Sequence, residues 1–234
     1  MKKSNPFFSP VIGIFFFLYA FVVPGNQMSR LHQQTSHILF VGNSLTYTND
    51  LPAIVARLAK EKGIDVTTEM LAFPDYALED HWNEGRMQTL IKEKQFDFVI
   101  VQQGPSSQAG GRAMLLDYGA RIKTLCEENK AKLAFFMVWP AFANLHTFDS
   151  VIKNYSDAAT STHSLLCPAG AVWKQHFTGT HDYSYYGPDQ FHPSEKGSEA
   201  AAGVIVETLF GSNSVSGFRN LCQPFNLLGY SMWR

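Results

Sequence analysis

The sequence predicts an α/β fold, a three-layer α/β/α sandwich around a central, mainly parallel sheet of about five strands. From His37 onward, short β-rich apolar runs alternate with longer stretches whose apolar residues recur with helical period. The runs at 37–41, 96–102 and 132–138 are apolar on consecutive positions, as expected for strands that helices cover on both faces. The 234 residues, of which 45% are hydrophobic and 17% charged, suit one ordinary domain.

Each element is predicted from its own local pattern. In residues 51–62 the apolar side chains are spaced for one face of a helix, and Gly63 supplies the stop. The same reasoning predicts strands at about 37–41, 65–71, 96–102 and 132–138, a fifth near 166–171, and further helices at about 78–94, 111–129, 148–165 and 194–210.

The first 35 residues differ from the rest of the chain. Lys2 and Lys3 precede an almost unbroken apolar stretch over 11–23, which is typical of an export signal. An uncleaved anchor, tethering the chain to a membrane through residues 7–23, is the alternative. We therefore divide the chain into a signal peptide or anchor plus linker (1–35), a domain (36–210) and a C-terminal tail (211–234), and expect an exported protein.

Charge and cysteine content narrow the function classes. The formal net charge is −1 and the 19 Lys and Arg residues form no long run, so we expect no nucleic-acid partner. Cys126, Cys167 and Cys222 lie far apart without a CxxC pair, which predicts neither a zinc site nor a dense disulfide framework. Cys126 and Cys167 are expected to be buried thiols, although Cys222 could pair with either.

Ser44 is the first candidate functional residue. It belongs to Gly42-Asn43-Ser44-Leu45-Thr46, directly after the strand at 37–41, and ligands of open α/β sheets bind beyond the carboxyl ends of the strands. Gly42 allows a sharp exit from the strand, and the start of a helical turn favours a developing negative charge. Ser44 is thus either a nucleophile or a residue that only satisfies loop N–H groups. Thr46 excludes the G-x-S-x-G elbow.

His192 is the second candidate. Asp189 precedes it by three residues, so the carboxylate can reach Nδ1 of the ring and fix its tautomer. Pro193 keeps His192 in the loop, and Ser194 can cap the following helix. The alternatives are a surface turn, or a metal site that includes two further histidines, His176 and His181.

Two further loops follow predicted strands. Residues 73–78 and 102–107 are placed to supply backbone or side-chain donors to the oxyanion of a tetrahedral intermediate. Their Pro, Gly, Asp and Ser residues are also those that ordinary turns use.

Taken together and in this order, the segments resemble the SGNH, or GDSL-like, hydrolase superfamily, whose sequence blocks follow successive strands of a flavodoxin-like sheet. Ser44 matches the nucleophile of block one in its G-N-S variant, while Asp189 and His192 match the acid and base of block five. The resemblance covers roughly residues 37–210.

The middle blocks depart from the superfamily pattern. Where the second block has an oxyanion-binding glycine, this chain has Asp75, or Tyr76 by a one-residue shift. Where the third block has G-x-N-D, Ser106 replaces the asparagine, so Gln103 or Gln102 is an alternative donor.

The resemblance implies a serine esterase that uses a Ser-His-Asp triad and neither a metal nor an organic cofactor. Export and the aromatic residues near the site-bearing loops suit acetyl groups on extracellular carbohydrate, with lipid and small acyl esters as further candidates. A non-catalytic carbohydrate-binding or scaffold module on the same fold is the alternative. The sequence does not predict an oligomeric state.

Overall fold

Five parallel strands form the central sheet of the computed structural model, which describes Met1 and residues 35–211. The strands are β1 (Ser36–Gly42), β2 (Val66–Ala72), β3 (Phe98–Val101), β4 (Lys132–Phe136) and β5 (Leu165–Cys167). Their order is β2-β1-β3-β4-β5, and each neighbouring pair is parallel. This is the flavodoxin-like order, so the predicted fold class is confirmed.

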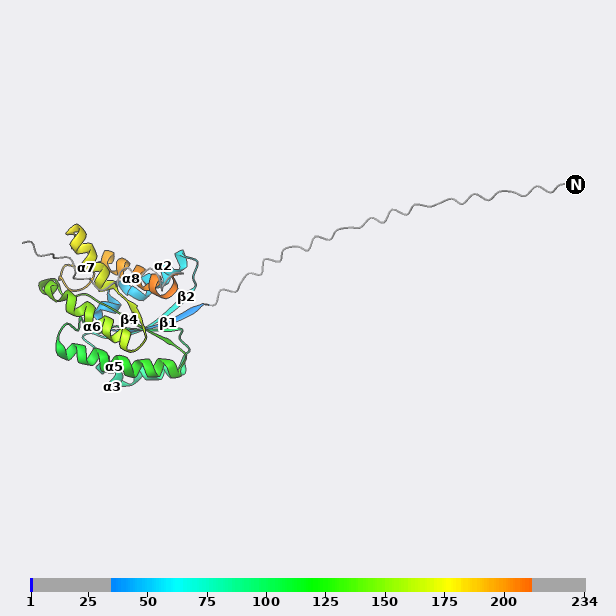
Figure 1. Cartoon of the computed structure of the whole chain (residues 1–234), viewed down its shortest axis with the longest axis horizontal. Coiled ribbons are helices and arrows are strands. Elements are labelled where there is room, and N and C mark those ends of the chain that lie inside the picture. The colour runs from blue at the N-terminus through cyan, green and yellow to red at the C-terminus, as the bar shows by residue number, and fades with distance from the viewer. Residues whose placement is uncertain (2–34, 212–234) are drawn as a thin grey trace, which may run out of the picture. The chain divides into compact units, whose positions relative to one another are not determined.

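Helices cover both faces of the sheet (Figure 1). One layer contains α2 and α8 with α7 beside α8, and the other contains α3, α4, α5 and α6. The helices are α1 (Ser44–Tyr47), α2 (Leu51–Glu61), α3 (Leu78–Glu84), α4 (Arg86–Glu93), α5 (Ala109–Glu128), α6 (Phe148–Ser161), α7 (Ala169–Thr180) and α8 (Glu195–Phe210), with short 3-10 helices η1 (Thr48–Asp50) and η2 (Phe142–Thr147).

The position of the site follows from the strand order. From β1 the chain crosses to β2 through α2, and it then returns past β1 to β3 through α3 and α4 on the other face. Right-handed crossovers require this change of face when the direction along the sheet reverses. Folds with such a switch in strand order bind ligands beyond the carboxyl ends of the two strands where the order switches, here β1 and β3.

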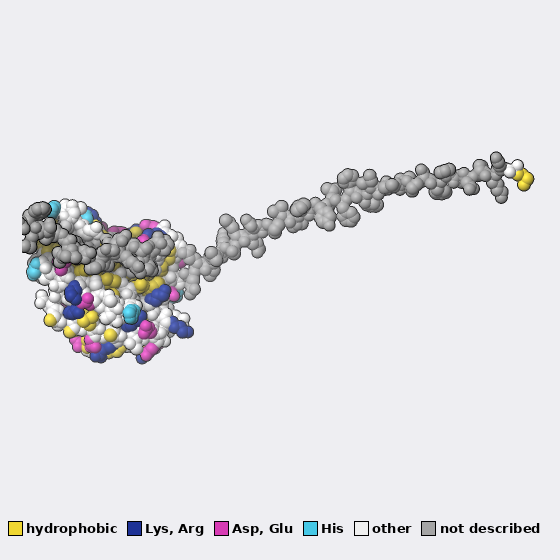
Figure 2. Space-filling model, in the orientation of Figure 1, with side chains coloured by type: hydrophobic (Ala, Val, Ile, Leu, Met, Phe, Trp, Pro, Cys, Tyr) yellow, Lys and Arg dark blue, Asp and Glu magenta, His cyan; other side chains and the backbone are white. Residues whose placement is uncertain are grey.

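The sheet is buried in the way that its consecutive apolar residues predict. Residues 38–41 of β1 are fully buried, and residues 99–101 of β3 nearly so. On the α2–α8 side, Arg57 pairs with Glu199, and Lys62 Nζ lies 3.0 Å from Glu207 Oε2. These ion pairs join the two helices at the surface. On the face shown in Figure 2, basic and acidic side chains are interspersed.

Two predicted elements need correction. The helix expected over 78–94 is two helices, because Gly85 takes a left-handed conformation (φ 84°) that ends α3 before α4 begins. The strand expected near 166–171 is only Leu165–Cys167, and the helix α7 starts at Ala169.

Several sequence predictions fall outside residues 35–211. These are the export signal or membrane tether, the tail after Gly211 and the pairing of Cys222. Among the described residues, no helix has the length and apolar character needed to cross a membrane. Cys126 and Cys167 are both fully buried free thiols, as predicted.

Candidate active site

Ser44 is the first residue of α1, immediately after β1. The turn into this helix is built by Asn43, whose Oδ1 accepts the N–H of Leu45 at 3.1 Å and whose carbonyl accepts those of Thr46 and Tyr47 at 2.8 and 3.1 Å. The first N–H groups of a helix have no intrahelical partner, so the backbone N–H of Ser44 is left for another acceptor. Ser44 itself is half-buried.

Gly42 contributes space rather than a sharp bend. It is still part of β1, paired with Ala72, and its φ is not positive. A Cβ at this position would lie 2.4 Å from Thr46 Oγ1 and 2.5 Å from Gln102 Oε1. The absence of a side chain therefore lets two polar groups approach the backbone just before Ser44.

Asp189 and His192 form a hydrogen-bonded pair, with 2.5 Å between Asp189 Oδ2 and His192 Nδ1. Asp189 Oδ1 also accepts the backbone N–H groups of Phe191 and His192 at 3.0 and 2.9 Å. The hydrogen bond from His192, followed by these N–H groups, lowers the pKa of Asp189 to about 2. A carboxylate only accepts, so Nδ1 carries the proton and Nε2 is the basic nitrogen.

The loop that carries this pair is fixed at the carboxyl edge of the sheet. The backbone carbonyl of Gln190 accepts the N–H of Phe142 at 2.8 Å, and the backbone carbonyl of Phe191 accepts the indole N–H of Trp139 at 3.0 Å. Trp139 and Phe142 both lie in the connection after β4. Ser194 caps α8 by accepting the N–H of Gly197 at 3.1 Å, as the sequence predicts.

Asn49 joins this loop to the segment that carries Ser44. Its Nδ2 donates to the carbonyl of Pro193 at 3.1 Å and to Ser198 Oγ at 2.9 Å. Pro193 follows His192 directly, and Asn49 is five residues after Ser44. The Ser44 segment and the His192 loop are therefore held side by side. Within residues 35–211 the structure contains no hydrogen bond between Ser44 Oγ and His192 Nε2, and such bonds often form only with substrate present.

The residues predicted for the oxyanion hole are divided between two loops. Asp75 is exposed and takes a left-handed conformation (φ 62°). Nδ2 of Asn43 donates to the carbonyl of Tyr76 at 3.0 Å, so the loop after β2 is attached to the turn that carries Ser44.

The loop after β3 has more internal hydrogen bonds than the loop after β2. Gln103 Nε2 donates to Ser106 Oγ at 2.8 Å and to the carbonyl of Gly111 at 2.9 Å. Ser106 Oγ in turn donates to the carbonyl of Gly104 at 3.0 Å. These donors hold the loop together, and a role for Gln103 or Ser106 in oxyanion binding would require some of these bonds to break.

Sequence reasoning missed His81, which the structure places against the turn that leads to Ser44. Its side chain is fully buried, and Nε2 lies 2.8 Å from the carbonyl oxygen of Gly42. Burial lowers the pKa of the imidazole, so the ring is neutral and donates its Nε2 proton. The only feature of the sequence that could have indicated this role is a histidine within a predicted helix.

The other two histidines of the metal alternative lie elsewhere. His176 stacks on Tyr185 with 4.2 Å between ring centres, and its Nε2 lies 3.2 Å from Asp182 Oδ2. His181 is exposed just after α7. In the described part of the chain, no group of three His, Cys, Asp or Glu residues is placed to hold a metal ion.

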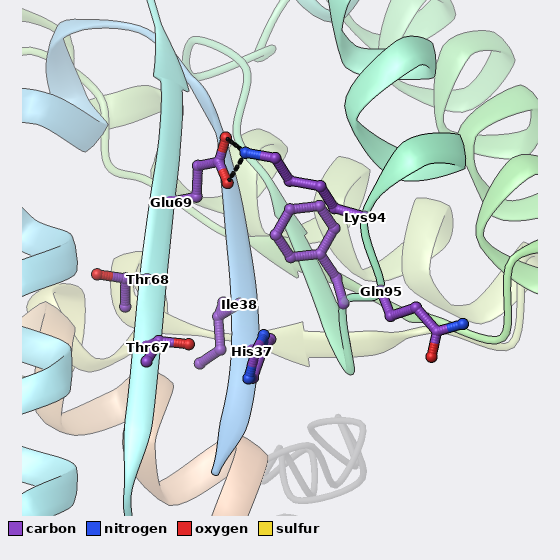
Figure 3. Close-up of a pocket in the computed structure, with 8 residues that line it drawn as sticks. His37, Ile38, Thr67, Thr68, Glu69, Lys94 and Gln95 are labelled. Atoms are coloured by element: carbon purple, nitrogen blue, oxygen red, sulfur yellow. Dashed lines mark hydrogen bonds and ion pairs between the residues drawn. The ribbon is translucent and has the colours of Figure 1, made fainter.

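A separate hollow of about 430 Å³ lies near the amino ends of β1 and β2 (Figure 3). His37, Thr67 and Thr68 line it, and Glu69 is paired with Lys94 Nζ at 2.7 Å. Because the candidate catalytic residues follow the opposite ends of the strands, this hollow is not part of their site.

The fold is that of the SGNH hydrolases. A chain from Slackia heliotrinireducens described as a candidate SGNH hydrolase is 24% identical and superposes with a TM-score of 0.64 over 75% of this chain and all of its own. A lipase/acylhydrolase from Enterococcus faecalis is 16% identical, with a TM-score of 0.59 over 74% of this chain and 94% of its own.

A third similar structure is a catalytic mutant of an acetylxylan esterase from Geobacillus stearothermophilus. It is 15% identical and superposes with a TM-score of 0.57 over 76% of this chain and 96% of its own. No family model matches the sequence, and no curated protein matches it.

Proposed function

We propose that this chain is a serine esterase in which Ser44 is the nucleophile, His192 the general base and Asp189 the residue that orients the base. The observation that carries the proposal is the Asp189–His192 pair, held beside the Ser44 segment by the hydrogen bonds of Asn49 to Pro193 and Ser198. A fold shared with SGNH hydrolases supports the same reaction class.

In the proposed reaction, Ser44 Oγ attacks the carbonyl carbon of an ester while His192 Nε2 takes the hydroxyl proton. Asp189 stays ionised: it accepts a hydrogen bond from Nδ1–H of His192 and stabilises the imidazolium that forms. The imidazolium then protonates the leaving alcohol. Water attacks the resulting acyl-enzyme by the same steps, which releases the acid and restores Ser44.

The oxyanion needs donors on the side of Ser44 away from the base. We assign this role to the backbone N–H of Ser44 and to the backbone of the loop that contains Asp75. Asn43 supports the assignment, because it caps α1 with Oδ1 and binds the carbonyl of Tyr76 with Nδ2. One side chain thus joins the two proposed donor segments.

For the substrate we propose an acetylated carbohydrate, acted on after export. Similar structures include acetylxylan esterases. Trp139 and Tyr186, two of the aromatic residues near the site, are buried and belong to the core. Tyr183 is 37% exposed and packs edge-on against Phe142, which is hydrogen-bonded to the His192 loop. Its ring is therefore available for stacking against a sugar.

Hydrolysis of an activated acetyl ester tests the proposal. We expect Ser44→Ala and His192→Ala each to reduce kcat by at least about 10³-fold, while the melting temperature stays close to that of the wild type. Undiminished turnover in either folded variant would contradict the assignment. A wild-type chain that binds acetylated oligosaccharide but hydrolyses nothing would instead favour the non-catalytic module, and loss of activity with a chelator would favour a metal.

A further inference from the structure

One peptide group, which joins Gly42 to Asn43 just before Ser44, is held at both ends by side chains from elsewhere in the fold. Its carbonyl oxygen accepts a hydrogen bond from Nε2–H of His81 at 2.8 Å and a longer one from the backbone N–H of Phe73 at 3.2 Å. Its N–H donates to Gln102 Oε1 at 2.9 Å. The C=O and N–H of a trans peptide point in opposite directions, so His81 from α3 and Gln102, the residue after β3, hold it from two sides.

The neighbours of Gln102 fix which way its amide faces. Oε1 also accepts the hydroxyl proton of Thr46 at 2.8 Å, and Nε2 donates to the carbonyl of Gln103 at 2.7 Å. An amide turned the other way would set N–H against N–H at Asn43 and oxygen against oxygen at Gln103. Gln102 is 1% exposed, so it acts here as a fixed acceptor.

His81 is not the residue that packing alone would favour at its position. The ring lies against Tyr76 and Phe73, with 5.1 and 6.0 Å between ring centres. Its Nδ1 is buried without a hydrogen-bond partner among the described residues. A buried polar atom without a partner destabilises the fold, and an aromatic hydrocarbon side chain would avoid that penalty. The distinguishing contribution of His81 is therefore its N–H donor to Gly42.

We propose that His81 and Gln102 are positioning residues of the turn that leads from β1 to Ser44. By fixing the plane of the Gly42–Asn43 peptide, they set the direction of the Ser44 hydroxyl and N–H. The next peptide is already fixed, because the carbonyl of Asn43 accepts the N–H groups of Thr46 and Tyr47. With both preceding peptides held, Ser44 has little freedom to turn. The catalytic consequence rests on the proposed esterase function.

Kinetics on three variants test the catalytic consequence. His81→Phe keeps an aromatic ring and removes the donor, and we expect kcat to fall roughly 100-fold with KM changed by less than about twofold. In His81→Gln an amide N–H can again reach the carbonyl of Gly42, and kcat should return to within about tenfold of the wild type. Ile122→Ala, in α5, is the control for a general loss of core stability.

A folded His81→Phe variant with wild-type kcat would overturn the proposal. An equal fall in kcat in Ile122→Ala would overturn it as well, since the effect would then reflect stability alone. The proposal would also be overturned if kcat in His81→Gln were as low as in His81→Phe while the two variants had the same melting temperature.

Nitrogen-15 NMR tests the clamp without any reference to catalysis. We expect a neutral His81 ring with its proton on Nε2, and an Asn43 amide that exchanges slowly with solvent and at least about tenfold faster in Gln102→Met. A proton on Nδ1 of His81, or a rapidly exchanging Asn43 amide in the wild type, would overturn the clamp. A wild-type chain that hydrolyses no ester refutes the proposed function, and these signals still decide the clamp.

Discussion

Replacing Asn49 tests how the two halves of the candidate site are held together. Asn49 is in η1, and its Nδ2 donates to the carbonyl of Pro193 and to Ser198 Oγ. It also takes a left-handed conformation, with φ 57°. Asn49→Gly removes the two hydrogen bonds and keeps that conformation accessible, whereas Asn49→Ala removes the bonds and adds backbone strain.

The expected losses follow from these contacts. A hydrogen bond contributes about 0.5–1.5 kcal/mol to stability, so Asn49→Gly should lower the free energy of unfolding by about 2 kcal/mol. Asn49→Ala should lose about 1 kcal/mol more, because left-handed backbone is unfavourable for alanine. We also expect kcat for an acetyl ester to fall about tenfold in both variants, since Ser44 and His192 are no longer held in register.

Urea denaturation and steady-state kinetics measure both effects. The reasoning would be refuted if Asn49→Gly were as stable and as active as the wild type. If Asn49→Ala were more stable than Asn49→Gly, the predicted cost of left-handed backbone for alanine at this position would be wrong.

Three further predictions concern packing, ionisation and thiol reactivity. Gly42→Ala introduces a Cβ within 2.5 Å of two oxygens, so thermal unfolding should show a loss of about 1–3 kcal/mol or more. The pKa of Asp189 is lowered to about 2 by its bond to His192. The resulting stability is present above the ordinary aspartate pKa near 3.9 and is lost as pH falls towards 2. The stability difference between wild type and Asp189→Asn should therefore shrink over that interval. Burial raises the pKa of Cys126 and Cys167 to about 12, so mass spectrometry should find both unmodified by iodoacetamide at pH 8 until urea unfolds the chain.

The sheet could be predicted because its strands carry their own signal. Residues 38–41 are apolar at every position, which only a strand buried on both faces explains well. Strand ends are harder to predict: residues 133–138 are all buried, yet β4 ends at Phe136. Burial continues into the following connection, and hydropathy alone does not report where strand pairing stops.

Two helices show where local patterns mislead. The break at Gly85 was signalled by the glycine, but the apolar period continues across it. The start of α7 lies in an apolar run that fits either a short strand or a buried helix. Pro168 is the N-cap of the helix, and Gly170 is needed in its first turn because a Cβ would lie 2.1 Å from the carbonyl oxygen of Val138.

The candidate site divides in the same way between local and distant contacts. Asp189 and His192 could be paired from sequence because they are only three positions apart. Asn49 and His81 could not, because their partners are 144 and 39 residues away along the chain. Only the folded sheet brings such residues to one edge.

The most direct test of the central claim is covalent labelling by a fluorophosphonate, followed by intact mass measurement and peptide mapping. A serine activated by His192 and Asp189 predicts one adduct per chain, located on Ser44, that is absent in Ser44→Ala and forms at least about 10³-fold more slowly in His192→Ala. An unlabelled wild-type chain, an adduct on another residue, or equal labelling rates in wild type and His192→Ala would contradict it.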